Sequence, residues 1–190
     1  MGTGNQTMET YMRLVIILLL TLLMPALSLP LPKELQGNIV PDFFVLAMDN
    51  ETELNRDNLA KEVKKTGAKR IVFSFFASWC TENCGPEFIK LKENSGILKE
   101  KGVSVYLIDV GEKIMQKGKE VSDFVSKYAG DAFPFYFNQN ASLLKNFGII
   151  ERNATQFSLP VILVMDANLK VLDVFTGVGN DFPQTLWNGL

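Results

Sequence analysis

A stretch of the sequence without charge places the strongest constraint on the fold. The segment RIVFSFFAS (70–78) carries no charged side chain after Arg70, and β-branched and aromatic residues fill most of it. A strand with one face in water would alternate apolar and polar positions, whereas this segment is apolar at nearly every position. We therefore predict a central strand over residues 70–78 that is buried on both faces.

The segments on either side of this strand alternate between helical and extended patterns. Residues 54–67 place Leu54, Leu59 and Val63 among charges and end on Gly67, which predicts a helix with a C-terminal stop. Further helices are expected at 82–100, 117–130, 140–149 and 183–189. Strands are expected at 41–46, 103–110, 134–137, 160–166 and 170–177, and the last two form a hairpin. This order predicts an α/β fold, a mixed sheet with helices on both faces, in one domain over residues 37–190.

The first 32 residues resemble a targeting segment. Arg13 is followed by LVIILLLTLLM (14–24) and then by Pro25, Ala26 and Ser28. We expect either a cleaved signal peptide or an N-terminal membrane anchor through residues 14–31. Both place the folded domain outside the cytoplasm, where disulfide chemistry is possible.

Composition narrows the chemistry that is available. The formal net charge is −2, and no run of Lys and Arg is present, so we expect no nucleic acid as a partner. The sequence has no histidine. Catalytic sites that need His, including Ser-His-Asp triads, Cys-His pairs and His-ligated metals, are therefore excluded. Any chemistry must use thiols, carboxylates or the backbone.

The two cysteines of the chain lie together at a predicted strand-to-helix junction, in FFASWCTENCGPEF (75–88). Cys80 falls at or just before the start of the helix, and Cys84 falls one turn inside it. Unpaired N–H groups and the helix dipole stabilise a thiolate at this point. We expect Cys80 to be an exposed nucleophile with a lowered pKa, and Cys84 to resolve the mixed disulfide that Cys80 forms.

The spacing of the pair is C-x3-C. Residues four apart in a regular helix have Cβ atoms about 5–6 Å from each other, whereas a disulfide needs roughly 3.5–4.5 Å. A bridge therefore requires Cys80 to lie outside helical geometry or the first turn to be distorted, which Gly85-Pro86 favours. A structural disulfide, two inert thiols and a metal site are the alternatives to a redox pair.

These motifs resemble the TlpA/ResA-like thiol–disulfide oxidoreductases of the thioredoxin superfamily. The resemblance rests on Pro41-Asp42-Phe43, on FFASWC (75–80), and on Cys84-Gly85-Pro86-Glu87, which matches the C-x-x-E of that group. Residues 117–149 resemble its helix–strand–helix insertion. The resemblance implies a thioredoxin fold and a reductase in the bacterial periplasm, with a role in cytochrome c maturation. Its partners would be protein thiols or disulfides and a membrane or periplasmic electron donor, and it needs no cofactor.

The same resemblance implies further site residues. Ser158-Leu159-Pro160 resembles the cis-proline loop, which would bring Pro160 against the cysteines and pair the Leu159 backbone with a substrate chain. Trp79 would complete the substrate-binding surface. Ser74 stands where thioredoxins carry a buried acid, which leaves Glu87 to assist proton transfer. The alternative for Glu87 is a solvated residue in the first turn of the helix.

Two other functions remain open at this point. C-x3-C followed by Pro and Glu also resembles the Sco copper chaperones, so Cys80 and Cys84 could bind Cu(I), with Met165 or Met115 as a thioether ligand. The alternative for both methionines is an ordinary core or surface position. A non-catalytic module that binds a partner through the cis-proline groove is the other possibility.

Overall fold

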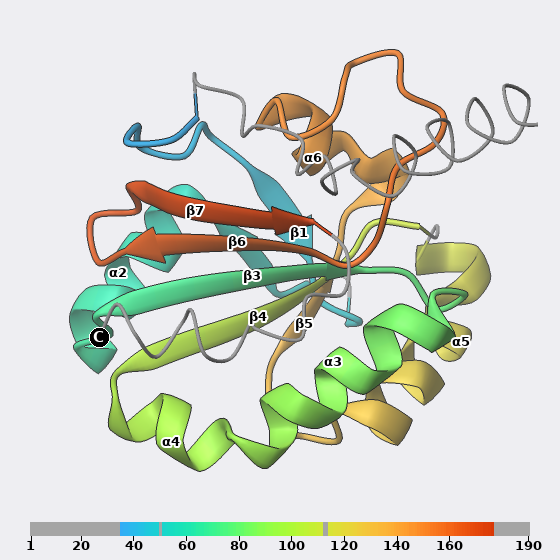
Figure 1. Ribbon diagram of the computed structural model, residues 1–190, viewed down its shortest axis with the longest axis horizontal. Coiled ribbons are helices and arrows are strands. Elements are labelled where there is room, and N and C mark those ends of the chain that lie inside the picture. Colours follow the sequence, from blue (N-terminus) through green and yellow to red (C-terminus); the bar gives the residue numbers. More distant parts are fainter. Residues whose placement is uncertain (1–34, 50, 112–113, 177–190) are drawn as a thin grey trace, which may run out of the picture. The chain divides into compact units, whose positions relative to one another are not determined.

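The computed structural model describes residues 35–49, 51–111 and 114–176, with the backbone alone at residues 114–117 and 139. Its strands form one mixed seven-stranded sheet in the order β2-β1-β5-β4-β3-β6-β7 (Figure 1). The strands are β1 (Phe44–Leu46), β2 (Glu53–Asn55), β3 (Arg70–Phe76), β4 (Val103–Asp109), β5 (Phe135–Phe137), β6 (Val161–Asp166) and β7 (Val171–Thr176). The helices are α2 (Arg56–Thr66), α3 (Thr81–Glu93), α4 (Ser95–Glu100), α5 (Ile114–Tyr128), the 3-10 turn η1 (Gln139–Ala141) and α6 (Ser142–Asn146).

Strand β3 lies at the centre of this sheet, as the uncharged stretch predicts. It runs parallel to β4 and antiparallel to β6, and every residue after Arg70 is buried. The buried positions include Ser74, which is fully enclosed. Because β3 and β4 are parallel, their carboxyl ends, at Phe76 and Asp109, lie at the same edge of the sheet.

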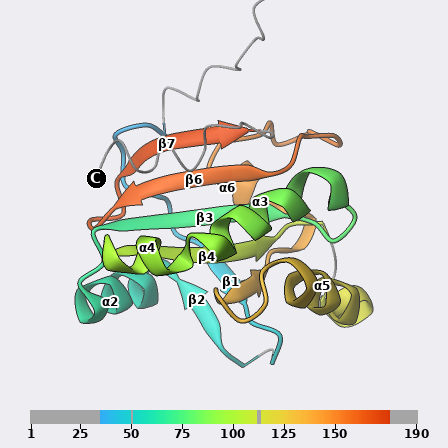
Figure 2. The ribbon, with the colours of Figure 1, turned by 60° about the horizontal axis from the view of Figure 1, so that its bottom comes forward.

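Helices cover both faces of the sheet (Figures 1 and 2). On one face, the Phe76 ring lies 4.9 Å from Phe88 of α3 and 5.6 Å from Phe124 of α5, measured between ring centroids. On the other face, the Phe43 ring contacts Phe73 of β3 at 5.5 Å and Phe147, just after α6, at 6.1 Å. Aromatic side chains therefore fix α3 and α5 to one side of the sheet and the opening segment to the other.

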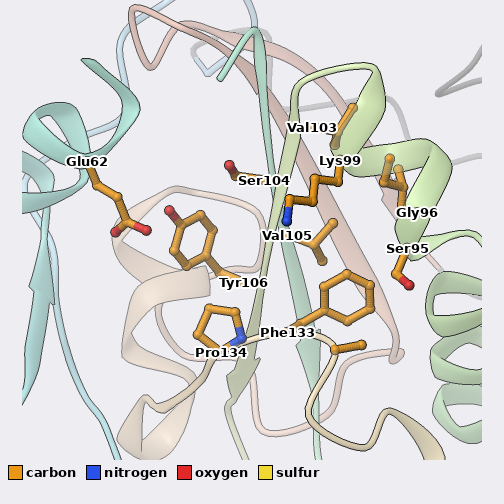
Figure 3. Close-up of a pocket in the computed structure, with 12 residues that line it drawn as sticks. Glu62, Ser95, Gly96, Lys99, Val103, Ser104, Val105, Tyr106, Phe133 and Pro134 are labelled. Carbon is orange, nitrogen blue, oxygen red and sulfur yellow. The ribbon is translucent and has the colours of Figure 1, made fainter. Parts of the chain in front are cut away.

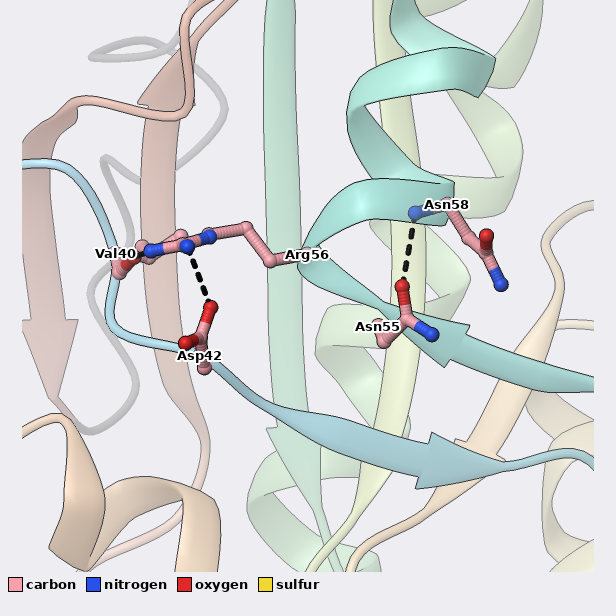
Figure 4. Close-up of polar contacts among 5 residues, drawn as sticks. All are labelled: Val40, Asp42, Asn55, Arg56 and Asn58. Carbon is pink, nitrogen blue, oxygen red and sulfur yellow. Dashed lines mark hydrogen bonds and ion pairs between the residues drawn. The ribbon is translucent and has the colours of Figure 1, made fainter.

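Helix α2 is held at both ends by local contacts that the sequence explains. The Asn55 side chain accepts a hydrogen bond from the Asn58 backbone N–H at 2.9 Å, which caps the helix (Figure 4). Arg56 forms an ion pair with Asp42 at 2.6 Å, which ties the helix to the segment before β1. The helix ends at Gly67, whose φ of 69° is the left-handed conformation that glycine adopts most readily.

Several element boundaries differ from the sequence-based expectations. The expected helix over 82–100 is two helices, because the backbone at Asn94 leaves helical geometry between α3 and α4. The expected helix over 54–67 starts later, because Leu54 belongs to β2, a strand that was not predicted. Of the expected opening strand, only residues 44–46 form a β-strand.

Parts of the chain that carry other expectations are not described. The expected helix at 183–189 and the expected leader over residues 1–32 lie outside the described residues. Among the residues that are described, no helix is long and apolar enough to cross a membrane.

Candidate active site

The cysteine pair sits where β3 passes into α3. The Cys80 N–H donates to the Ala77 carbonyl at 2.9 Å, which makes a tight turn after the strand. Cys80 has φ −82° and ψ 48°, outside helical geometry, and α3 begins at the next residue. Cys80 and Cys84 are joined by a disulfide with a Cα–Cα distance of 5.4 Å. The non-helical Cys80 is the departure from regular geometry that a C-x3-C bridge was expected to require.

The expectation of an exposed Cys80 is wrong for this oxidised state. Only 7% of Cys80 is accessible, and Cys84 is fully buried. The Cys80 sulfur lies 3.7 Å from the Leu159 carbonyl oxygen, so the loop before β6 covers it. A disulfide sulfur carries no proton, so this contact is van der Waals packing here. After reduction, the Cys80 thiol can donate a weak hydrogen bond to the same oxygen.

The loop that covers Cys80 is the one expected to contain a cis-proline. The Leu159–Pro160 peptide bond is cis. Strand β6 begins at Val161, which is in register with Phe75 of β3, so the loop lies beside the end of β3. Leu159 is buried, with 4% of its surface accessible, and it presents its backbone to the cysteine. The structure thus brings Leu159 and Pro160 to the cysteine pair.

Trp79 is the exposed part of this region, with 62% of its surface accessible. It lies against Gly111, in the loop after β4: a Cβ at Gly111 would be 2.9 Å from Trp79 Nε1 and would also meet Ala77. The nearer clash would be with the Ala77 Cβ, at 2.5 Å, so a larger residue at position 111 would disturb the turn after β3 as well as Trp79. Gly111 was not predicted from the sequence, although a glycine just after a buried strand signals such a close approach.

Glu87 is buried rather than solvated, and it lies in the second turn of α3. Only 6% of it is accessible, and Ser74 of β3 donates a hydrogen bond to its Oε1 at 2.9 Å. Burial raises the pKa of Glu87 to about 8, against the smaller lowering effects of the Ser74 hydrogen bond and the charge of Lys90. Glu87 and Cys84 are three residues apart on α3, so they share one face of the helix.

The start of α3 is packed closely against α5. A Cβ at Gly85, the residue after Cys84, would lie 2.9 Å from Tyr128 Cε1. Pro86 follows inside the helix, which continues through it to Glu93. Glycine at position 85 therefore lets α5 support the turn that carries the cysteines.

The described residues give little support to a metal centre. Among them, no group of three or more His, Cys, Asp or Glu side chains is placed to hold a metal ion. Met165 is buried and pairs with Ile71, four residues along β6 from the end that adjoins the cysteines. Met165 is therefore a core residue and not a thioether ligand for the pair. The Met115 side chain is outside the described part of the structure.

A cleft of about 330 Å³ lies elsewhere in the molecule. Glu62, Lys99 and Tyr106 are among the residues that line it (Figure 3). Val103, the first residue of β4, also lines it. The cysteines follow the last residues of the parallel strand β3, so the cleft is at the opposite edge of the sheet and is not part of the site.

The sequence matches the redoxin family over residues 35–186. The chain belongs to this family. A comparison with curated protein sequences finds no match. The redoxin match covers both cysteines, Glu87 and the cis-proline loop.

Solved structures share the fold at low sequence identity. The thioredoxin domain of a thiol-disulfide oxidoreductase from Bacteroides vulgatus is 14% identical, with a TM-score of 0.61 over 81% of this chain and 96% of that one. A secreted disulfide oxidoreductase from Mycobacterium tuberculosis, homologous to E. coli DsbE, is 15% identical, with a TM-score of 0.53 over 77% and 92%. StoA from Bacillus subtilis is 16% identical, with a TM-score of 0.54 over 79% and 98%. The redoxin therefore has a thioredoxin-like fold, and its family and its disulfide support thiol–disulfide oxidoreductase activity.

Proposed function

We propose that this redoxin is an extracytoplasmic thiol–disulfide oxidoreductase that acts on protein substrates through Cys80 and Cys84. The observation that carries the proposal is the disulfide at the start of α3, whose outer sulfur lies 3.7 Å from the backbone of the cis-proline loop. A substrate sulfur that reaches Cys80 therefore meets a backbone carbonyl and the exposed Trp79 beside it. We propose Trp79, Leu159 and Pro160 as the substrate-binding surface.

The direction we propose is reduction of the substrate. The Cys80 thiolate attacks one sulfur of a substrate disulfide; that S–S bond breaks, and a mixed disulfide to Cys80 forms. The Cys84 thiolate then attacks the Cys80 sulfur, which releases the second substrate thiol and restores the Cys80–Cys84 bond. Two electrons pass from the protein to the substrate, and an external thiol donor must return them. The reductase direction rests on the resemblance to the TlpA/ResA-like group.

Glu87 is the proposed proton carrier of this cycle. When a donor thiolate attacks Cys80, Cys84 leaves as a thiolate in a buried position, where a negative charge is costly. With a pKa of about 8, Glu87 is protonated at neutral pH and can supply that proton. In the reverse step, its carboxylate can accept the proton of Cys84.

The proposed location outside the cytoplasm is supported by the charged and apolar pattern of residues 13–24. The comparison with a secreted protein of the same fold agrees with it. Expression of the full chain with a C-terminal reporter that is active only after export tests this proposal. A fusion protein that is made in full but shows no reporter activity would contradict it.

The exchange function is tested by insulin reduction in the presence of dithiothreitol, together with trapping of intermediates. Wild-type protein should accelerate the reduction, Cys80→Ser should abolish the acceleration, and Cys84→Ser should accumulate a mixed disulfide with the substrate through Cys80. Exposed Ser126→Ala on α5 is the matched control and should behave as wild type. If the wild type neither forms the internal disulfide nor reduces insulin, and instead binds one Cu(I) per chain in an anaerobic titration, the proposal is wrong.

A further inference from the structure

A buried hydroxyl on β3 has no part in the exchange steps described so far. Ser74 is the only polar residue within β3 after Arg70, and it is fully enclosed in the sheet. Its Oγ donates a hydrogen bond to Glu87 Oε1 at 2.9 Å. A strand position between Phe73 and Phe75 in the middle of a core would ordinarily be apolar, so the hydroxyl needs its buried partner.

We propose that Ser74 is a positioning residue for thiol–disulfide exchange, whose hydroxyl holds the Glu87 carboxyl through the hydrogen bond between β3 and α3. This proposal rests on the proposed function, because it assigns Glu87 a proton to give and to take. The geometry supports it, since this contact joins β3 to α3, the two elements on either side of the turn that carries Cys80. A carboxyl held at one oxygen keeps one orientation through the cycle.

Burial and the Ser74 hydrogen bond act in opposite directions on the pKa of the Glu87 carboxyl. Burial raises the pKa of Glu87 and favours its protonated form. The Ser74 hydrogen bond favours the charged form and lowers the pKa, to a resulting value of about 8. The hydrogen bond therefore lets Glu87 release its proton more easily than burial alone would allow.

Among the described residues, no charged group near Glu87 lowers its pKa as much as the Ser74 hydrogen bond does. Lys90, one turn along α3, also lowers the pKa of Glu87, but its effect is smaller than that of Ser74. From the sheet, the register partner of Ser74 on β4 is the apolar Leu107, and Asp109 lies two residues further along the same face. From α5, Tyr128 packs against Gly85. The remaining charged side chains of α3 and α5 in this region are exposed: Glu82, Asp123 and Lys127.

The direct test follows the carboxyl itself in the oxidised full-length protein. Titration of the Glu87 side-chain carbon by ¹³C NMR should give a midpoint near pH 8 in the wild type. Ser74→Ala should raise that midpoint by about one pH unit, because the hydrogen bond to the charged form is lost. Ser74→Thr, which keeps the hydroxyl, should restore it. Ser104→Ala, the same change on β4 three residues before the register partner of Ser74, should leave it unchanged.

The second test follows the reaction. When dithiothreitol reduces the oxidised protein, its thiolate attacks Cys80, the Cys80–Cys84 bond breaks, and the Glu87 proton passes to the leaving Cys84 sulfur. The rate of Ser74→Ala relative to wild type should be below one at pH 7, because Glu87 is protonated in both proteins and only the variant has lost the contact that holds the carboxyl. This ratio should rise about fivefold from pH 7 to pH 9, because the variant keeps its proton to higher pH. A merely structural role for Ser74 would change the rate equally at both pH values.

The outcomes separate this proposal from the proposed function. If the wild type reduces insulin, but Ser74→Ala keeps both the wild-type titration midpoint and the wild-type pH profile, the role of Ser74 is refuted and the exchange function stands. If the wild type shows no exchange, the proposed function fails whatever the titration gives. If Ser74→Ala does not fold, isotope-edited infrared spectroscopy of Glu87 in the wild type at pH 6 shows whether its carboxyl accepts the hydrogen bond from Ser74. A hydrogen-bonded carbonyl frequency supports the proposal, and the frequency of a free acid overturns it.

Discussion

Replacing Glu87 with glutamine should remove a pH dependence that this one buried carboxyl gives to folding. Its pKa is raised from 4.5 to about 8 in the folded protein, chiefly by desolvation. Between these two values the folded state holds a proton that the unfolded state has released. The free energy of unfolding therefore falls as pH rises through this window, by about 1.4 kcal/mol per pH unit and by about 5 kcal/mol in all. Above pH 8 both states are ionised, and the loss is complete.

Urea unfolding of the oxidised protein at pH 5 and pH 7 measures this effect. The stability of Glu87→Gln relative to wild type should increase by about 2.5 kcal/mol from pH 5 to pH 7. Glutamine has nearly the same volume and can still accept the hydrogen bond from Ser74, so packing should change little. Glu82→Gln, at an exposed position on the same helix, should show no such pH-dependent gain. A difference between Glu87→Gln and wild type that stays constant over this range would refute the reasoning.

Two further changes test the packing around the site. Gly85→Ala should destabilise the fold by about 1–3 kcal/mol in urea unfolding, because its Cβ would lie 2.9 Å from a ring carbon of Tyr128. Gly96→Ala, a helical glycine with open space around it, should be neutral or stabilise by up to about 1 kcal/mol, and equal effects at both glycines would contradict the contact. Asn55→Ala should cost about 1 kcal/mol by removing the cap of α2, whereas Asn55→Asp should keep it; a neutral alanine variant would show that the cap contributes nothing.

Much of the architecture follows from local patterns in the sequence. The uncharged segment 70–78 identifies the central strand, and Gly67 marks the end of α2. Strand β2 escaped prediction because three residues are too few to show a period, and Leu54 fits a helical pattern equally well. The break at Asn94 was missed for a similar reason, since the charges and apolar positions on its two sides continue one helical pattern.

The chemistry at this site follows from the order of the amino acids: two thiols at the start of a helix and no histidine in the chain. The environment of those thiols depends on how distant segments pack together. Glu87 could have faced water, and it is buried because α3 packs this side against Ser74, thirteen residues earlier on β3. Cys80 is covered by Leu159, seventy-nine residues away along the chain. A periodic pattern specifies which side of a helix or strand is apolar, whereas the partner of each buried polar group depends on which distant segments the sheet order brings together.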